Sequence, residues 1–317
     1  RRLVIDSLSR EKQERTYLSL AKLMNCEETE SINESDRQYI LNHTLIRKIE
    51  AFDTSKVLWQ TPLSFLASDS EENEFNLKKR NIPDSLKSRL NIPDSESDVL
   101  RVKTQEQIDV LLPEYRESKV TSAGQLPSGF DPGSLYASRS HPRALQMTIY
   151  AASDAIRSTG FSIDQLRNIV PPDQIAVYSG SAMGQLDEES YGGLLQNALI
   201  GKRPSSKHCA LGLPEMAGDF VNAYVLGSVG ETAGIIGACA TFLYNLKRGM
   251  DDIRTGNKRI VVVGNSEAPV QPQVIEGYRV MGALADDESL KTLDNSDVCD
   301  NRRACRPFSS NSGFTVA

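Results

Sequence analysis

The chain has 317 residues, of which 39% are hydrophobic and 25% charged, and its formal net charge is −6. This is the composition of an ordinary globular protein that is long enough to bury a substantial core. The acidic balance argues against nucleic acid as the main partner, because nucleic-acid binding depends on basic patches. No apolar run approaches the roughly 20 residues of a membrane-spanning helix, so we expect no membrane partner.

The sequence begins at Arg1 without a methionine or the apolar run of a signal peptide, so we expect that the true N-terminus has been lost. Residues 1–118 differ from the rest of the chain. A charged stretch with a helical face is followed by a second predicted helix, Tyr39–Phe52, and the face consists of Tyr17, Leu20, Leu23 and Met24.

Residues 68–97 are polar and contain an imperfect duplication, Asn81–Ser85 and Asn91–Ser95, each copy with a proline that interrupts helix. Two copies are too few for a solenoid, and we interpret the segment as an exposed excursion without chemistry of its own. We therefore predict that residues 1–118 form a helical and irregular N-terminal insertion.

From Thr121 the pattern becomes that of a layered α/β domain, which we predict over residues 119–317. The run Arg259–Val263 is almost continuously apolar, which is typical of a strand covered on both faces. The other predicted elements are the helix Arg143–Thr159, the strand Ile175–Tyr178 with the glycine-containing loop Gly180–Gly184, and the helix Ala217–Leu226.

Cys239 is the candidate nucleophile. Gly237, Ala238 and Ala240 around it permit a sharp turn, and the stretch 242–255 that follows has apolar residues at helical spacing and ends at Gly256. A thiol at a helix N-terminus faces unpaired N–H groups, which favours the nucleophilic thiolate. The same residues also fit a small buried cysteine beside a tight turn.

The other four cysteines do not suggest a metal site, since no C-x-x-C pair occurs and the chain has only three histidines. Scattered cysteines in odd number are most simply reduced thiols of a cytoplasmic protein. We interpret the neighbours His208 and Cys209 as surface or interface residues.

Six short motifs occur in a characteristic order. They are Gly180–Gly184, Gly237–Thr241, Val263–Ala268, Met281–Leu284, Arg306–Phe308 and Ser312–Phe314. In order and distance this series resembles the β-ketoacyl-acyl-carrier-protein synthases, over about two thirds of the chain. The resemblance is closest to bacterial synthases with a long N-terminal region, on the segments Ala123–Phe130 and Gly237–Asn245.

The resemblance implies a thiolase-like fold with α-β-α-β-α layers, built from two similar halves, of which this chain carries mainly the first. The second half of such enzymes supplies two catalytic histidines, and no histidine follows Cys239 here, so we expect that this chain is part of a longer synthase. The implied reaction is acyl transfer to Cys239, then decarboxylative Claisen condensation with a malonyl-carrier protein. No metal or organic cofactor is needed.

The resemblance also implies site residues and partners. Met183 corresponds to a gate of the acyl pocket and Tyr278 to its lining, although both also fit ordinary packing. Phe242 is a further candidate for substrate binding, and Glu267 is expected to be structural. The basic cluster Lys202, Arg203 and Lys207 is the candidate docking surface for the acyl carrier protein. A second choice is Arg254, Lys258 and Arg259. A homodimer is expected, in which two subunits pair through the strand that leads to Cys239 and the helix Ala217–Leu226.

Three alternatives stay open. The first is a synthase primed by coenzyme A, or a thiolase that uses the same cysteine. The second is a non-catalytic subunit that shapes the chain-length cavity, although such subunits typically lack the nucleophile that is intact here. The third is an inert structural fragment. The polar run Ser309–Ser312 replaces a run that is more acidic in many enzymes of the resembled family, and this departure argues against an ion-binding or hydrogen-bonding role for that loop.

Overall fold

The structure is a computed structural model that describes residues 8–24, 26, 31–43, 45–66, 72–306 and 314–315, without the side chains of Leu23 and Leu45. The motif residues Phe308 and Gly313 and the run Ser309–Ser312 lie outside the described residues. The chain forms two compact units, one of residues 53–118 and one that combines residues 1–52 with 119–317.

The boundary near residue 118 agrees with the sequence interpretation, but residues 1–52 do not belong to an insertion. Strand β1 (Leu45–Lys48) pairs antiparallel with β6 (Ser122–Gln125), and the Ile49 N–H donates to the Thr121 carbonyl. Because this pairing joins positions almost 80 residues apart, no local pattern in the sequence could indicate it.

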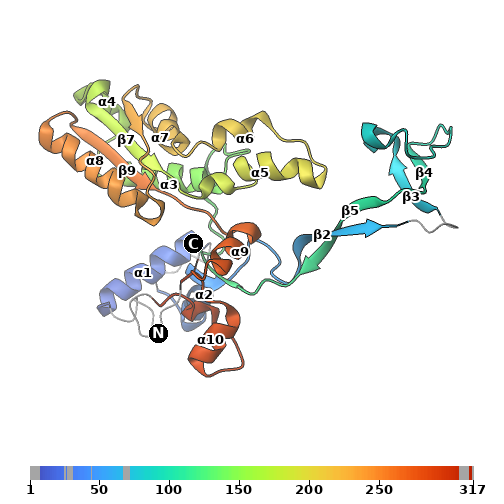
Figure 1. Cartoon of the computed structure of the whole chain (residues 1–317). Helices are drawn as coiled ribbons and strands as arrows, with labels where there is room; N and C mark the ends of the chain where they lie inside the picture. Colours follow the sequence, from blue (N-terminus) through green and yellow to red (C-terminus); the bar gives the residue numbers. More distant parts are fainter. Residues whose placement is uncertain are drawn as a thin grey trace. The chain divides into compact units, whose positions relative to one another are not determined.

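The unit 53–118 is made of strands, so the predicted helical character is wrong there (Figure 1). Strand β2 (Val57–Phe65) pairs with β5 (Ile108–Arg116), and β3 (Asn73–Lys78) pairs with β4 (Val99–Thr104). The two duplicated segments lie between β3 and β4, where η2 (Lys79–Asn81) and η3 (Asp84–Leu86) form short turns. They are not wholly exposed: isoleucines from both copies, Ile82 and Ile92, pack on the small core of Leu90, Leu100 and Val102.

The N-terminal helices α1 (Arg10–Leu23) and α2 (Glu34–His43) pack together around a small core. Of the predicted apolar face of the first helix, Tyr17 and Met24 lie in this core and Leu20 packs against it, while the side chain of Leu23 lies outside the description. The buried residues of the core are Tyr17, Ala21, Met24, Ile32 and Ile40. The second predicted helix is wrong beyond His43, because the chain then enters β1 and its pairing with β6.

A parallel sheet in the order β8-β7-β9 forms the centre of the large unit. Its strands are β7 (Ile175–Gly180), β8 (Glu231–Ala233) and β9 (Ile260–Asn265). All six residues of the central strand β7 are buried. The predicted strands at 175–178 and 259–263 are therefore confirmed.

Helices cover both faces of this sheet, as Figure 1 shows. On one face, α3 (Arg143–Ser158), α4 (Ile163–Ile169) and the π-helical turn Val221–Leu226 after α7 (Met216–Phe220) enclose the main core, which includes Ala152, Ile156, Val177, Val221 and Leu226. On the other face lies α8 (Thr241–Thr255), whose Gly249 lies against Val261 and Val263. The result is an α-β-α arrangement.

Helix α8 turns an unusual side toward the sheet. Its buried residues are small or polar, namely Thr241, Asn245, Gly249 and Asp252. The apolar residues Phe242, Met250 and Ile253, which share a helical face in the sequence, are exposed. Small side chains let the helix backbone approach the sheet closely, and this leaves the apolar side of α8 uncovered by described residues.

The remaining helices of this unit are α5 (Tyr191–Gln196), α6 (Ser206–Leu211), α9 (Pro272–Val280) and α10 (Asp287–Asp294). Ile275 of α9 packs with Ile49, Val120 and Ala123, and the side chain of Asp287 accepts hydrogen bonds from Thr121. Short turns complete the unit at η4 (Pro132–Leu135), η5 (Pro172–Gln174), η6 (Gly184–Leu186), η7 (Asn197–Ile200), η9 (Ala238–Ala240) and η10 (Asn301–Arg303). Within the described part of the chain, no helix has the length and hydrophobicity needed to cross a membrane.

Candidate active site

Three loops meet at one edge of the parallel sheet. Strand β7 runs into the turn Ser181–Gly184, β8 leads to the cysteine turn, and β9 is followed by Glu267. In a parallel sheet the carboxyl ends of neighbouring strands lie at the same edge, where ligands of α/β proteins commonly bind. Contact is close: a Cβ on Gly180 would lie 2.7 Å from Cδ1 of Ile236. A Cβ at this position would require the end of the Ile236 side chain to shift, so β7 and the cysteine turn lie in direct contact.

Cys239 lies on a strained turn. Ala238 has φ +48°, a left-handed conformation that is uncommon for a residue with a Cβ. A short turn over Ala238–Ala240 leads directly into α8, which ends at Gly256 with φ +76°. The predicted sharp turn and helix are confirmed. The Cys239 side chain is exposed, so its interpretation as a buried core cysteine is wrong.

Two buried side chains of α8 hold this turn. The Thr241 hydroxyl donates to the Ala238 carbonyl at 2.7 Å and accepts from the Gly237 N–H at 3.0 Å. The Asn245 carboxamide accepts from the Ile235 N–H at 3.0 Å and donates to the Ile235 and Thr241 carbonyls. The positioning role of these residues was missed from sequence. The available signal was an asparagine inside the predicted helix, six residues after the cysteine, because asparagine is a poor residue for a helix interior.

Glu267 holds the second turn at this edge of the sheet, Ser181–Gly184. Its carboxylate accepts hydrogen bonds from the backbone N–H groups of Ala182 and Met183, the latter at 2.9 Å, and from the Ser181 hydroxyl at 3.1 Å. The Ser181 oxygen in turn accepts from the Gly184 N–H at 2.7 Å. These contacts agree with the structural role expected for Glu267.

Tyr278 of α9 is the predicted pocket-lining aromatic. Burial raises the pKa of its phenol, and the electrostatic influence of Cys239 and Glu267 acts in the same direction. The fold thus brings the end of β7 next to the cysteine turn, where a Cβ on Gly180 would lie 3.6 Å from Cγ2 of Thr241, and Glu267 binds the adjoining turn that carries Met183. Phe242 stands in the first turn of α8, close in sequence to the thiol, and is exposed. Among the described residues no group of three His, Cys, Asp or Glu side chains could hold a metal ion.

The predicted docking residues lie elsewhere in the same unit. Lys202 and Arg203 follow η7, Lys207 lies in the first turn of α6, and all three are exposed without an ion-pair partner among the described residues. Burial and the positive charge of Lys207 both lower the pKa of His141, which precedes α3. The second-choice cluster of Arg254, Lys258 and Arg259 is less available for docking, since Lys258 forms an ion pair with Glu231 at 3.0 Å.

His208 is not a surface residue as predicted. Its side chain is buried, and Nδ1 accepts a hydrogen bond from the Ser205 N–H at 3.2 Å, which caps the start of α6. Its neighbour Cys209 is exposed, as expected. All five cysteines are free, including Cys26, Cys299 and Cys305, which are partly buried.

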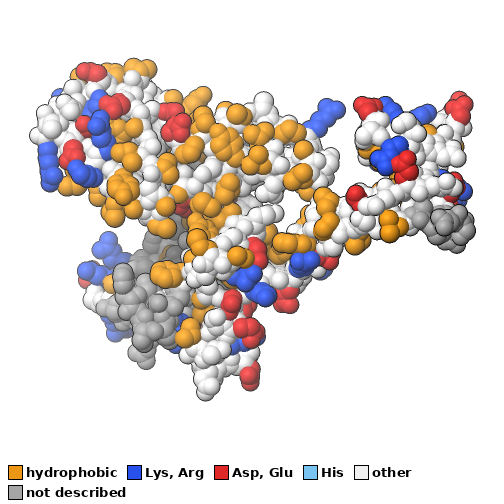
Figure 2. All heavy atoms as spheres, in the orientation of Figure 1, with side chains coloured by type: hydrophobic (Ala, Val, Ile, Leu, Met, Phe, Trp, Pro, Cys, Tyr) orange, Lys and Arg blue, Asp and Glu red, His pale blue; other side chains and the backbone are white. Residues whose placement is uncertain are grey.

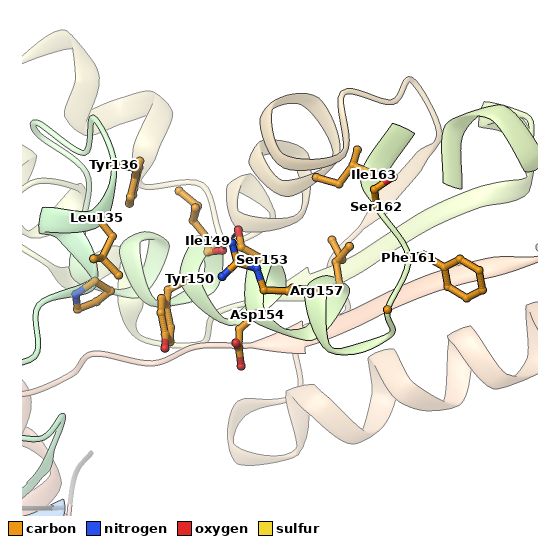
Figure 3. Close-up of a pocket in the computed structure, with 13 residues that line it drawn as sticks. Leu135, Tyr136, Ile149, Tyr150, Ser153, Asp154, Arg157, Phe161, Ser162 and Ile163 are labelled. Carbon is orange, nitrogen blue, oxygen red and sulfur yellow. Dashed lines mark hydrogen bonds between the residues drawn. The ribbon is translucent and has the colours of Figure 1, made fainter. Parts of the chain in front are cut away.

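A hollow of about 680 Å³ lies beside α3, away from the cysteine turn (Figure 3). Leu135, Tyr136, Tyr150, Arg157 and Phe161 contribute to its lining, and none of the residues predicted for catalysis or substrate binding does. The hollow is therefore not the substrate site that the sequence predicts.

The comparisons with known proteins identify the family of the chain. The family model described as "Beta-ketoacyl synthase, N-terminal domain" matches residues 88–315. Since this is most of the chain, the chain belongs to the β-ketoacyl synthase family. The match begins inside the unit 53–118, before the boundary predicted at residue 119.

Individual relatives support this assignment. The whole chain aligns with 53% of β-ketoacyl-[acyl-carrier-protein] synthase FabY of Pseudomonas aeruginosa, and the aligned sequences are 44% identical. The crystal structure of that ketosynthase superposes with a TM-score of 0.91 over 98% of this chain and 52% of the other. Nodulation protein E of Rhizobium sp. (strain N33) is 29% identical over 164 residues, 52% of this chain and 36% of that protein. The fold is thus that of a ketosynthase, and the chain spans about half the length of FabY.

Proposed function

We propose that this chain is the nucleophile-bearing half of a β-ketoacyl-acyl-carrier-protein synthase of fatty-acid biosynthesis. The observation that carries the proposal is Cys239, an exposed thiol at the start of α8, on a turn held by two buried side chains. Membership of the family supports the same reaction. The exposed apolar side of α8 supports a second layer of structure in the full-length protein, where the catalytic histidines would lie.

The proposed chemistry has two parts. First, the Cys239 sulfur attacks the carbonyl of an acyl-carrier thioester, and the carrier thiol leaves with a proton. The transient oxyanion is held by backbone N–H groups, one of them from Cys239 itself. Second, a malonyl-carrier protein loses carbon dioxide, and the resulting enolate carbon attacks the acyl-enzyme. The new carbon–carbon bond forms as the Cys239 sulfur leaves.

The test is incubation of the full-length protein with acyl-carrier protein, followed by peptide mass spectrometry. We expect an acyl mass increase on the peptide that contains Cys239, and release of a β-ketoacyl product when malonyl-carrier protein is added. Loading from coenzyme A thioesters with none from the carrier protein would favour the alternative synthase or a thiolase. No loading from either donor would contradict an acylated nucleophile and leave the non-catalytic alternatives.

We also propose docking of the acyl carrier protein at Lys202, Arg203 and Lys207. Carrier proteins are acidic, and exposed charges mainly speed encounter and are screened over about 8 to 10 Å at physiological salt. Reversing Lys202 and Arg203 to Glu should raise the apparent KM for acyl-carrier protein by about three- to tenfold and flatten its salt dependence. The measurement is loading kinetics at several salt concentrations.

A matched control for the docking test reverses the exposed Arg10 and Lys12 of α1, which changes the net charge equally. Loading from a small thioester should be unaffected in both variants, since it needs no docking surface. Equal losses with the small and the carrier-bound substrate would mean that the cluster supports the fold or the pocket.

We further propose a homodimer that pairs through the outer edge of β8 and the adjacent Met216–Leu226 segment. The proposal is supported by the position of β8 at the edge of the sheet, and by exposed apolar residues beside it, among them Val229 at 89% and Tyr224 at 76% exposure. Figure 2 shows hydrophobic side chains spread over the visible face of the part that contains this sheet.

Analytical ultracentrifugation of the full-length protein tests the dimer. We expect a dimer that dissociates in a Tyr224→Asp, Val229→Asp variant, because burying two unpaired carboxylates at an interface is strongly unfavourable. A wild-type monomer, or a dimer that both substitutions leave intact, would contradict this interface.

We also propose that the protein is located in the cytoplasm, which is supported by its five free cysteines.

A further inference from the structure

One carboxylate organises the whole turn that carries Met183. Glu267 accepts from two consecutive backbone N–H groups, those of Ala182 and Met183, and from the Ser181 hydroxyl. Through Ser181 the network reaches the Gly184 N–H. Four successive residues of the turn are therefore ordered, directly or through one hydroxyl, by a side chain that follows a different strand.

The turn has little room to rearrange while these bonds are present. Gly184 is buried, and a Cβ there would lie 2.4 Å from the Ser181 Oγ and 2.6 Å from the Ala144 Cβ. Hydrogen bonds to a carboxylate are about twice as strong as those between neutral groups. The backbone of Met183, and with it the starting direction of its side chain, is thus set by Glu267.

The same carboxylate lies at the reacting edge of the sheet. The turn that it holds begins beside the cysteine turn, because a Cβ on Gly180 would lie 2.7 Å from Cδ1 of Ile236 and 3.6 Å from Cγ2 of Thr241. An acyl chain attached to the Cys239 sulfur would extend from this edge. The position of Met183 on the neighbouring turn is then suited to limit how far such a chain can enter.

We infer that Glu267 is a positioning residue that fixes Met183 and thereby sets the length of acyl chain accepted at Cys239. This inference rests on the proposed function. Glu267 does not touch the reacting atoms. It acts through the turn Ser181–Gly184, and loosening that turn should admit longer chains.

The test compares wild type with Glu267→Gln in the full-length protein. Glutamine keeps the shape but replaces one acceptor oxygen with an NH₂ group that faces backbone N–H donors. We expect the rate of Cys239 loading from the longest relative to the shortest acyl thioester in a series to rise by about tenfold, the factor expected from losing one such bond. Alkylation of Cys239 by iodoacetamide should stay within about twofold of wild type.

Glu276→Gln is the matched control, because Glu276 makes an ion pair with Arg279 on α9 and takes no part in the turn. This variant should leave the chain-length profile unchanged. A double-mutant cycle with Met183→Ala provides the sharper readout. If Glu267 acts through Met183, Glu267→Gln should change the profile little once the Met183 side chain has been removed.

The outcomes are distinguishable. An unchanged profile in Glu267→Gln, an equal fall for every chain length, or additive effects in the cycle would overturn the inference and leave Glu267 as a brace for the fold. Should Glu267→Gln not fold, Glu267→Asp, which draws the carboxylate back by one methylene, enters the same cycle. If wild-type Cys239 accepts no acyl group from any thioester, the proposed function fails together with this inference.

Discussion

Replacing Cys239 with serine is expected to lower acyl loading by on the order of 10⁴-fold or more, because a serine hydroxyl here lacks the reactivity of a thiolate. The fold should persist, since the side chain is exposed and the substitution is nearly isosteric. Loading is measured by mass spectrometry and stability by thermal unfolding. Cys209→Ser, at the other exposed cysteine, is the control and should load normally.

The same assignment predicts an order of cysteine reactivity. Cys239 should be alkylated by iodoacetamide first, since it is exposed and stands at a helix N-terminus. Cys299 should react last at neutral pH, because burial raises the pKa of its thiol to about 11 and only about one molecule in ten thousand then carries the thiolate. Its alkylation should accelerate as the pH rises toward 11. Peptide mapping in which Cys209 or Cys305 reacts while Cys239 does not would contradict the nucleophile.

Asn245→Leu is expected to impair the cysteine turn more than any other substitution outside the thiol itself. It keeps the number and branching of the side-chain non-hydrogen atoms, although the methyl groups are bulkier, and it removes the partners of the Ile235 N–H and carbonyl, at a cost of about 1–3 kcal/mol in the free energy of unfolding. Loading of Cys239 should fall by about 100-fold, since displacing a nucleophile by about 1 Å can cost that much. The two effects are measured separately, by thermal unfolding and by single-turnover loading.

Thr241→Val tests the second side chain that holds the cysteine turn. The expected fall in Cys239 loading is smaller, because only one hydroxyl is removed. Thr255→Val, at the far end of α8, is its control: that hydroxyl also donates to a helix carbonyl but lies away from the turn. If the Asn245→Leu protein is less stable but Cys239 is loaded at the normal rate, the hydrogen bonds of Asn245 contribute to the stability of the fold and not to catalysis.

The sequence alone was sufficient to predict the features that depend on neighbouring residues. The cysteine turn, the helix 242–255 that ends at a glycine, and the strand 175–178 all follow from local spacing and from residues with special backbone preferences. The motif order around Cys239 also indicated the family that the comparisons then showed. These features could be predicted because each is encoded within a few consecutive residues.

Only the tertiary structure decided the rest. The pairing of β1 with β6, the strands of residues 53–118 and the burial of His208 depend on partners far apart in sequence or on packing, which no local periodicity encodes. The hydrogen bond from the Met183 N–H to Glu267 joins residues that lie more than 80 positions apart in the sequence. Helix α8 shows the same limit: its apolar spacing predicted a helix, but the sheet took the small and polar side, because close approach of the backbone required residues such as Gly249.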